Sequence, residues 1–177
     1  MNTNLSLVLV AALALAGCAG SSKSADVSVS VRRSLDDAGL KDVSVNQDRD
    51  KGIVTLGGHV TNEQDKSRAE SLARPLAAGQ VVAMEVAVIP VGDEALAKAV
   101  NKDLDLGIEH NVDAALLRAQ MHDAVKYEVK NAVVTLTGEV QSQTIRAAAE
   151  DLTSRVPNVK QVVNTLQIKG QKATSSN

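Results

Sequence analysis

Two stretches of the chain alternate apolar and polar residues, and each is followed by apolar residues at helical spacing. Residues 53–60 and 133–140 place apolar side chains at every second position, the period of a half-buried strand. Asn62 and Ser142, both good helix N-caps, follow these strands. Each strand is therefore expected to lead into an amphipathic helix.

The two stretches belong to an internal repeat with a shift of 80 residues. Five of eight positions in residues 53–60 and 133–140 are identical. The alignment needs no gap from Ile53 to Ile168. Such self-similarity indicates a duplicated structural unit.

The flanking patterns complete one unit as α-β-β-α-β. A helix at 27–38 and a strand at 43–45 precede the motif strand of the first unit, and Pro75 is expected to end or kink its second helix near Arg74. In the second unit, helical patterns at 93–103 and 108–117 are predicted to be split at Gly107. The fold class predicted is α+β, with two tandem αββαβ units, each a three-stranded mixed sheet with two helices packed on it.

Domain boundaries follow from composition, with Pro90-Val91-Gly92 as the break between the units. We expect Gly58 and Gly138 to face inward, where a side chain would meet the helix that crosses the sheet. The expected segments are a signal peptide at 1–17, a tether at 18–25, the first domain at 26–90, a linker or helix at 91–104, the second domain at 105–169 and a disordered tail at 170–177.

The N-terminus resembles a bacterial lipoprotein signal. The apolar run at 5–16 is too short to span a bilayer and has the length of a signal-peptide core. Leu15, Ala16 and Gly17 then precede Cys18 as in a lipobox, which implies cleavage before Cys18 and acylation of its thiol. Ala19, in place of Asp, favours the outer membrane, so we expect a chain anchored by acyl chains to its periplasmic face.

Composition narrows the range of functions. The net charge is −2 and the charges are evenly spread, so no basic block indicates nucleic acid binding. One Tyr and no Phe or Trp leave the core to aliphatic residues and supply no aromatic platform for bases. Cys18 is the single cysteine, so no internal disulfide is possible.

Candidate catalytic and metal-binding residues are sparse. His59, His110 and His122 have no nucleophile elbow or metal-ligand spacing around them. We therefore expect solvated histidines, no metal, no cofactor and no enzymatic activity.

One amphipathic face is a candidate for lipid or partner contact. Ile108, Val112 and Leu116 share a helix face, and Lys126 and Lys130 flank the following hairpin, where they could meet lipid headgroups. Packing of the three apolar residues in the core of their own unit is the alternative.

The repeated motif Val-Thr-Leu-x-Gly-x-Val, at 54–60 and 134–140, resembles the BON domain. Asn164 also fits the family's last strand, whereas Met84 takes its place in the first unit. With the lipobox, the chain is similar to OsmY-like dual-BON lipoproteins of the periplasm and outer membrane. This resemblance implies a non-enzymatic envelope protein that binds phospholipid, including anionic phospholipid, and supports outer-membrane integrity or stress tolerance. The alternative is a periplasmic adaptor that binds an envelope protein and is only localised by its lipid anchor.

Overall fold

The structure is a computed structural model that describes residues 23–92 and 94–170. Cys18, the lipobox and residues 171–177 of the tail expected at 170–177 lie outside the described residues.

Each unit contains two helices and a mixed sheet, in the predicted order. The first unit consists of α1 (Ser28–Asp37), β1 (Val43–Asp48), β2 (Ile53–Val60), α2 (Glu63–Leu76), β3 (Val81–Met84) and β4 (Ala87–Val88). The second consists of α3 (Glu94–Arg118), β5 (Val125–Lys130), β6 (Val133–Val140), α4 (Gln143–Ser154), β7 (Gln161–Asn164) and β8 (Gln167–Ile168).

The two sheets have the same topology, which confirms the α+β prediction. β1 pairs antiparallel with β2, and β3 and β4 both pair parallel with β2 as two pieces of one interrupted strand. β5, β6, β7 and β8 repeat this arrangement. The β2–β3 and β6–β7 registers correspond at the 80-residue shift. The duplication seen in the sequence is therefore a duplication of structure.

The alternating strand pattern builds the two cores. Val54 and Leu56 of β2 are fully buried under α1 and α2, and Val134 and Leu136 take the same places in the second unit. Their period-two spacing places these side chains on the helix-covered face of each sheet.

The predicted N-caps are confirmed. The side chain of Asn62 accepts a hydrogen bond from the amide of Asp65, and that of Ser142 from the amide of Ile145. Pro75 is the penultimate residue of α2, which ends at Leu76, two residues after Arg74 and close to the predicted end. A proline removes one intrahelical hydrogen bond, and so close to the end of a helix this loss is easily accommodated.

The predicted break at Gly107 is wrong, since α3 is one continuous helix of 25 residues. A glycine inside a helix costs only about 1 kcal/mol relative to alanine. Ile108, Val112 and Leu116, all buried directly after Gly107, offset that cost by packing on the second sheet.

The predicted environment of Gly58 and Gly138 is also wrong. Both are exposed, with positive φ angles of 83° and 122°. A Cβ at Gly58 would lie 2.1 Å from the backbone oxygen of Asp42, and one at Gly138 would lie 2.3 Å from that of Ala124. Glycine is needed here because the backbone of the neighbouring strand approaches too closely for any side chain, whereas no helix is involved.

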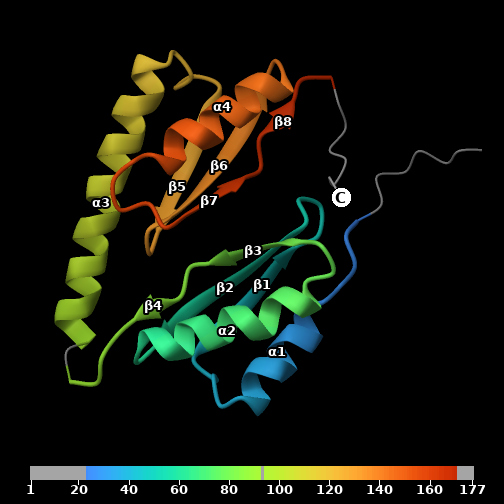
Figure 1. Cartoon of the computed structure of the whole chain (residues 1–177), viewed down its shortest axis with the longest axis vertical. Helices are drawn as coiled ribbons and strands as arrows, with labels where there is room; N and C mark the ends of the chain where they lie inside the picture. Colours follow the sequence, from blue (N-terminus) through green and yellow to red (C-terminus); the bar gives the residue numbers. More distant parts are fainter. Residues whose placement is uncertain (1–22, 93, 171–177) are drawn as a thin grey trace, which may run out of the picture.

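The two units meet through their sheets. Figure 1 shows the helices on the outer sides and the edge strands β3 and β7 facing each other. A small apolar cluster joins the two units and consists of two sets of repeat-equivalent positions, Ile53 and Ala83 in the first unit and Val133 and Val163 in the second.

Candidate functional site

The first half of α3 presents apolar side chains to solvent. Leu96 is 64% exposed, Val100 56% and Leu106 42%. We call these three residues the α3 patch. At 100° per residue, Leu96 and Val100 lie on one face of the helix, one turn apart. Val91, in the loop before the helix, is 82% exposed.

The position of α3 explains why the same helix has an exposed and a buried half. Its second half packs on the sheet and on α4 through Ile108, Val112 and Leu116. Its first half extends beyond the second unit toward β4 of the first (Figure 1). Leu96 and Val100 are therefore left exposed, whereas Leu104, further along the helix, packs against the core of the second unit.

The five residues predicted for lipid or partner contact do not form an exposed surface. Ile108, Val112 and Leu116 are at most 1% exposed, so they pack in the core as the alternative stated. The ammonium of Lys126 donates to the backbone oxygen of His122, and Lys130 forms an ion pair with Glu85 at 2.9 Å. The structure does not bring these five residues together as one exposed surface.

Sequence reasoning missed the α3 patch. Leu96 and Val100 were predicted to lie in a linker or helix at 91–104, and among the described residues of the first unit α1 begins only at Ser28, the equivalent of Ile108. The i, i+4 spacing of Leu96 and Val100 gave no warning, because the same spacing is typical of a helix face that packs on a core.

Lys130 belongs to the joint between the units. Its pKa is raised because it hydrogen-bonds to the carboxylate of Glu85, although partial burial acts in the opposite direction. The side chain of the adjacent Asn131 donates to the backbone oxygen of Glu85 at 2.6 Å. Both contacts anchor the β5–β6 turn to the end of β3.

Asp105 of α3 holds the same turn. Its two carboxylate oxygens accept from the backbone amides of Asn131 and Ala132, each at 2.8 Å. Asn131 and Ala132 have positive φ angles, as the two central residues of a tight hairpin turn require. The carboxylate therefore satisfies two amides that the turn directs at the helix.

Gln161 completes the joint by binding the free edge of β3. Its side-chain oxygen accepts from the amide of Met84 at 3.0 Å, and its side-chain nitrogen donates to the oxygen of Val82 at 2.8 Å. One side-chain amide thus replaces a neighbouring strand at the edge of the first sheet.

A small cluster of titratable groups lies near the end of α3. The ring of His122 is 3.0 Å from a carboxylate oxygen of Asp113, and the hydroxyl of Tyr127 donates to the same oxygen at 3.3 Å. Burial, followed by the charge of Asp113, raises the pKa of Tyr127. His59 and His110 are exposed elsewhere. The cluster lines neither the groove between α4 and β7 nor the cavity between the two units.

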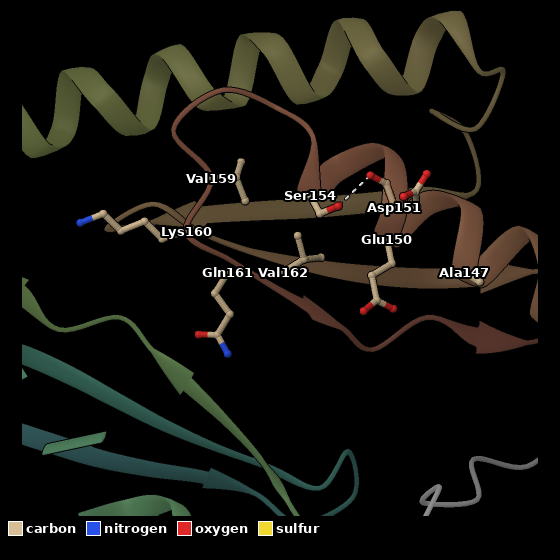
Figure 2. Close-up of a pocket in the computed structure, with 8 residues that line it drawn as sticks. All are labelled: Ala147, Glu150, Asp151, Ser154, Val159, Lys160, Gln161 and Val162. Atoms are coloured by element: carbon tan, nitrogen blue, oxygen red, sulfur yellow. Dashed lines mark hydrogen bonds between the residues drawn. The ribbon is translucent and has the colours of Figure 1, made fainter. Parts of the chain in front are cut away.

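The larger cavity, of about 390 Å³, is an open groove between α4 and β7 (Figure 2). Its carboxylates already have partners: Glu150 accepts from the side chain of Asn164, and Asp151 pairs with Arg155. Figure 2 shows Lys160 and Gln161 turned away from α4. The groove therefore offers little free polar chemistry.

In 23–92 and 94–170, no three His, Cys, Asp or Glu side chains are grouped to hold a metal ion. None of the helices that the structure describes combines the length and apolar character needed to cross a bilayer.

Known proteins were compared with the chain at three levels. No curated protein matches its sequence. Two solved structures of CdsD, a structural protein of the type III secretion system of Chlamydia trachomatis, are similar at 13% and 14% identity, with TM-scores of 0.31 and 0.32. The matches cover 77% and 78% of this chain. The chain spans 61% of the first CdsD structure, its C-terminal domain, and 90% of the second.

The sequence model of the BON domain matches residues 22–90 and 94–170, one segment for each structural unit. The second match begins at the start of α3, so the whole helix lies within it. The chain therefore belongs to the BON domain family and contains two tandem copies of the domain.

Proposed function

We propose that this protein is a lipid-anchored envelope protein whose BON domains bind phospholipid without catalysis. The observation that carries the proposal is the α3 patch, which exposes large apolar side chains on a helix that belongs to a BON domain. BON domains can bind phospholipid, and an exposed amphipathic helix is a common way to contact a membrane surface.

The surroundings of the α3 patch are mixed in charge. Lys98 and Lys102 are exposed on this half of α3, and so are Glu94 and Asp103. At 100° per residue, Lys98 lies on the side of the helix opposite Leu96, whereas Asp103 lies on the same side as Leu96. We therefore expect burial of the apolar side chains, rather than charge, to drive binding to the membrane.

The α3 patch alone would bind a membrane weakly, and the acyl chains on Cys18 would contribute most of the free energy of membrane binding. Full burial of a Leu or Val side chain contributes about 1.5–3 kcal/mol. Leu96 and Val100 are a little over half exposed, so together they offer on the order of 2 kcal/mol, about thirtyfold in binding. Acyl chains on Cys18, at about 0.8 kcal/mol per methylene, hold the protein at the membrane.

We further propose that the protein lies on the periplasmic face of the outer membrane and supports envelope integrity or stress tolerance. The lipobox at 15–18 and the alanine after Cys18 support this location. Mass spectrometry of the protein isolated from membranes tests it: an acylated Cys18 at the N-terminus agrees with the proposal, and an uncut, unmodified N-terminus overturns it.

Flotation with vesicles tests the binding function without the anchor. The protein is residues 18–177 with Cys18→Ala, which retains every described helix and strand. We expect it to float with phosphatidylglycerol vesicles and to lose most of that binding when Leu96→Asp and Val100→Asp are combined. The matched control is Val29→Asp on α1, which is equally exposed at 67% and lies outside the α3 patch. Equal binding by both variants would refute the role of α3.

A protein partner is the second candidate, and two features of the sequence favour it. The chain has no Trp or Phe to anchor it at a membrane interface, and Leu96 and Val100 have the spacing of helices that dock into apolar grooves. Crosslinking from Leu96 in envelopes distinguishes the two. Recovery of one specific protein, abolished by Val100→Asp, supports the adaptor, whereas recovery of lipid alone supports the membrane.

A further inference from the structure

The segment that precedes α1 is bound to one end of the first domain, at the β1–β2 turn of residues 49–52. The amide of Ser24 donates to the backbone oxygen of Arg49 at 2.9 Å, and the guanidinium of Arg49 donates to the backbone oxygen of Ser24 at 2.7 Å. The ammonium of Lys23 pairs with the carboxylate of Asp50 at 3.3 Å. The chain is therefore attached to the turn several residues before its first helix begins.

Two glutamines continue this attachment up to α1. The side-chain nitrogens of Gln47 and Gln80 both donate to the backbone oxygen of Ala25, at 2.6 and 3.0 Å. The side-chain oxygen of Gln47 accepts from the amide of Val27 at 3.1 Å, and Val27 itself is buried in the core of the first domain. We call these contacts of residues 23–27 the clamp.

The clamp limits how far the first domain can move from its proposed anchor. Cys18 lies six residues before Ser24, so a fully extended chain keeps Ser24 within about 22 Å of the acylated residue. Without the clamp, the first fixed residue would be Ser28 of α1, ten residues after Cys18, and the reach would rise to about 36 Å.

The α3 patch lies at the opposite end of the first domain. β2 runs from Ile53, beside the turn, to Val60, where β4 pairs with it shortly before α3 begins. A strand of eight residues is about 26 Å long. Figure 1 shows the N-terminal segment and the start of α3 at opposite ends of the first domain. The clamp and the patch are therefore two separate points.

The joint between the domains fixes these two points relative to each other. Asp105 of α3 binds the β5–β6 turn, and Lys130 of that turn pairs with Glu85 of the first domain. Gln161 binds the edge of β3. The α3 patch therefore keeps one position relative to the clamp.

We infer that the clamp holds the β1–β2 turn of the first domain at the phospholipid surface, as a second membrane-facing point in addition to the α3 patch. The inference rests on the proposed function and adds to it the orientation of the protein on the membrane. A chain held at one end of a domain and in contact at the other lies along the bilayer. The first attachment also keeps the weakly binding patch at a high effective concentration near the lipid.

The test supplies the anchor chemically, so that it does not depend on acylation in the cell. Residues 18–177 have one thiol, at Cys18, which is coupled to a maleimide lipid in phosphatidylglycerol nanodiscs. A gadolinium-chelating lipid in the nanodisc broadens the NMR signals of amides near its surface. We expect stronger broadening at residues 49–52 than the average for strands β5–β8, and equal broadening would overturn the inference.

Opening the clamp should move the turn away from the bilayer. Gln47→Ala, Arg49→Ala and Gln80→Ala together remove its glutamine and arginine side chains, and most of the broadening at the turn should then be lost. The matched control combines Gln141→Ala, Gln143→Ala and Arg33→Ala, which are exposed positions outside the clamp, and should keep the broadening.

A second variant leaves every described residue unchanged. A flexible insertion of about ten Gly and Ser residues after Ser22 lengthens the connection to Cys18, so broadening at the turn should fall here too. Undiminished broadening with this insertion would show that the clamp and the short connection do not position the turn, and would overturn the inference.

The inference and the proposed function fail separately. Leu96→Asp with Val100→Asp should abolish the broadening of α3 amides and leave that of residues 49–52 in place. Persistent broadening of α3 in this variant counts against the α3 patch alone. Because the nanodisc anchor is chemical, an unmodified Cys18 in cells would count against the lipoprotein proposal and leave the measured position of the turn unchanged.

Discussion

Gly58 and Gly39 offer a matched test of how the repeated motif is built. Their φ angles are nearly equal, at 83° and 81°. A Cβ at Gly39 meets no atom within 4 Å, whereas one at Gly58 lies 2.1 Å from the backbone oxygen of Asp42. Alanine at either position therefore suffers the same left-handed backbone strain, and only Gly58→Ala adds the clash.

The magnitudes follow from these two effects. The left-handed conformation costs a residue with a Cβ roughly 1–2 kcal/mol, which is the loss we expect for Gly39→Ala. Forcing strand β1 away from β2 adds about 1–3 kcal/mol, as overpacking does elsewhere. Gly58→Ala should therefore cost about 2–5 kcal/mol in total.

Urea denaturation followed by circular dichroism measures both variants. Each kcal/mol should also lower the melting temperature of a domain of this size by about 4–8 °C. Gly138→Ala repeats the test in the second domain, where the Cβ would lie 2.3 Å from the backbone oxygen of Ala124. Equal losses for Gly39→Ala and Gly58→Ala would show that backbone strain alone explains the motif glycine.

Three further outcomes test other parts of the structure. Leu136→Ala should lower stability by about 2–5 kcal/mol because Leu136 is fully buried, whereas Leu117→Ala, at a position 54% exposed, should change it by less than about 0.5 kcal/mol in urea denaturation. Gln161→Ala should speed hydrogen exchange at the β3 amide that it now caps, and unchanged protection would argue against the joint. Tyr127 is the only tyrosine, so its absorbance at high pH reports a single group. Its raised pKa means that it stabilises the folded state below the pKa of an unfolded tyrosine, near 10, and that this contribution is lost as pH rises through the folded value. Asp113→Asn should bring that pKa closer to 10, and no change would exclude the carboxylate as a cause.

The repeated αββαβ order was predictable because its signals are local. Period-two alternation marks the core positions of β2 and β6, and polar N-caps mark the starts of α2 and α4. The 80-residue shift then places each signal twice, which strengthens every assignment.

Two features were not predictable because they depend on tertiary contacts. Gly107 is a plausible helix break in sequence, and only the burial of Ile108, Val112 and Leu116 shows why α3 continues through it. Gly58 reads as an inward strand position, but its backbone conformation places it against the carbonyl of Asp42 instead.

The α3 patch and the joint between the units could not be predicted either, because they too depend on tertiary structure. The α3 patch exists because the first half of α3 extends past its sheet, which no pattern within the helix specifies. The joint brings together Glu85, Asp105 and Lys130, which are far apart along the chain. Residues paired in this way carry no periodic signal.

Fluorescence from a single label on α3 tests the membrane proposal most directly. Cys18 is the chain's only cysteine, so Cys18→Ala leaves a cysteine-free protein in which Leu96→Cys accepts one environment-sensitive fluorophore. With phosphatidylglycerol vesicles, we expect a blue shift from a label at Leu96 and none from a control label at Val29 on α1. No shift at Leu96, or the same shift at both positions, would contradict the proposal that α3 meets the membrane.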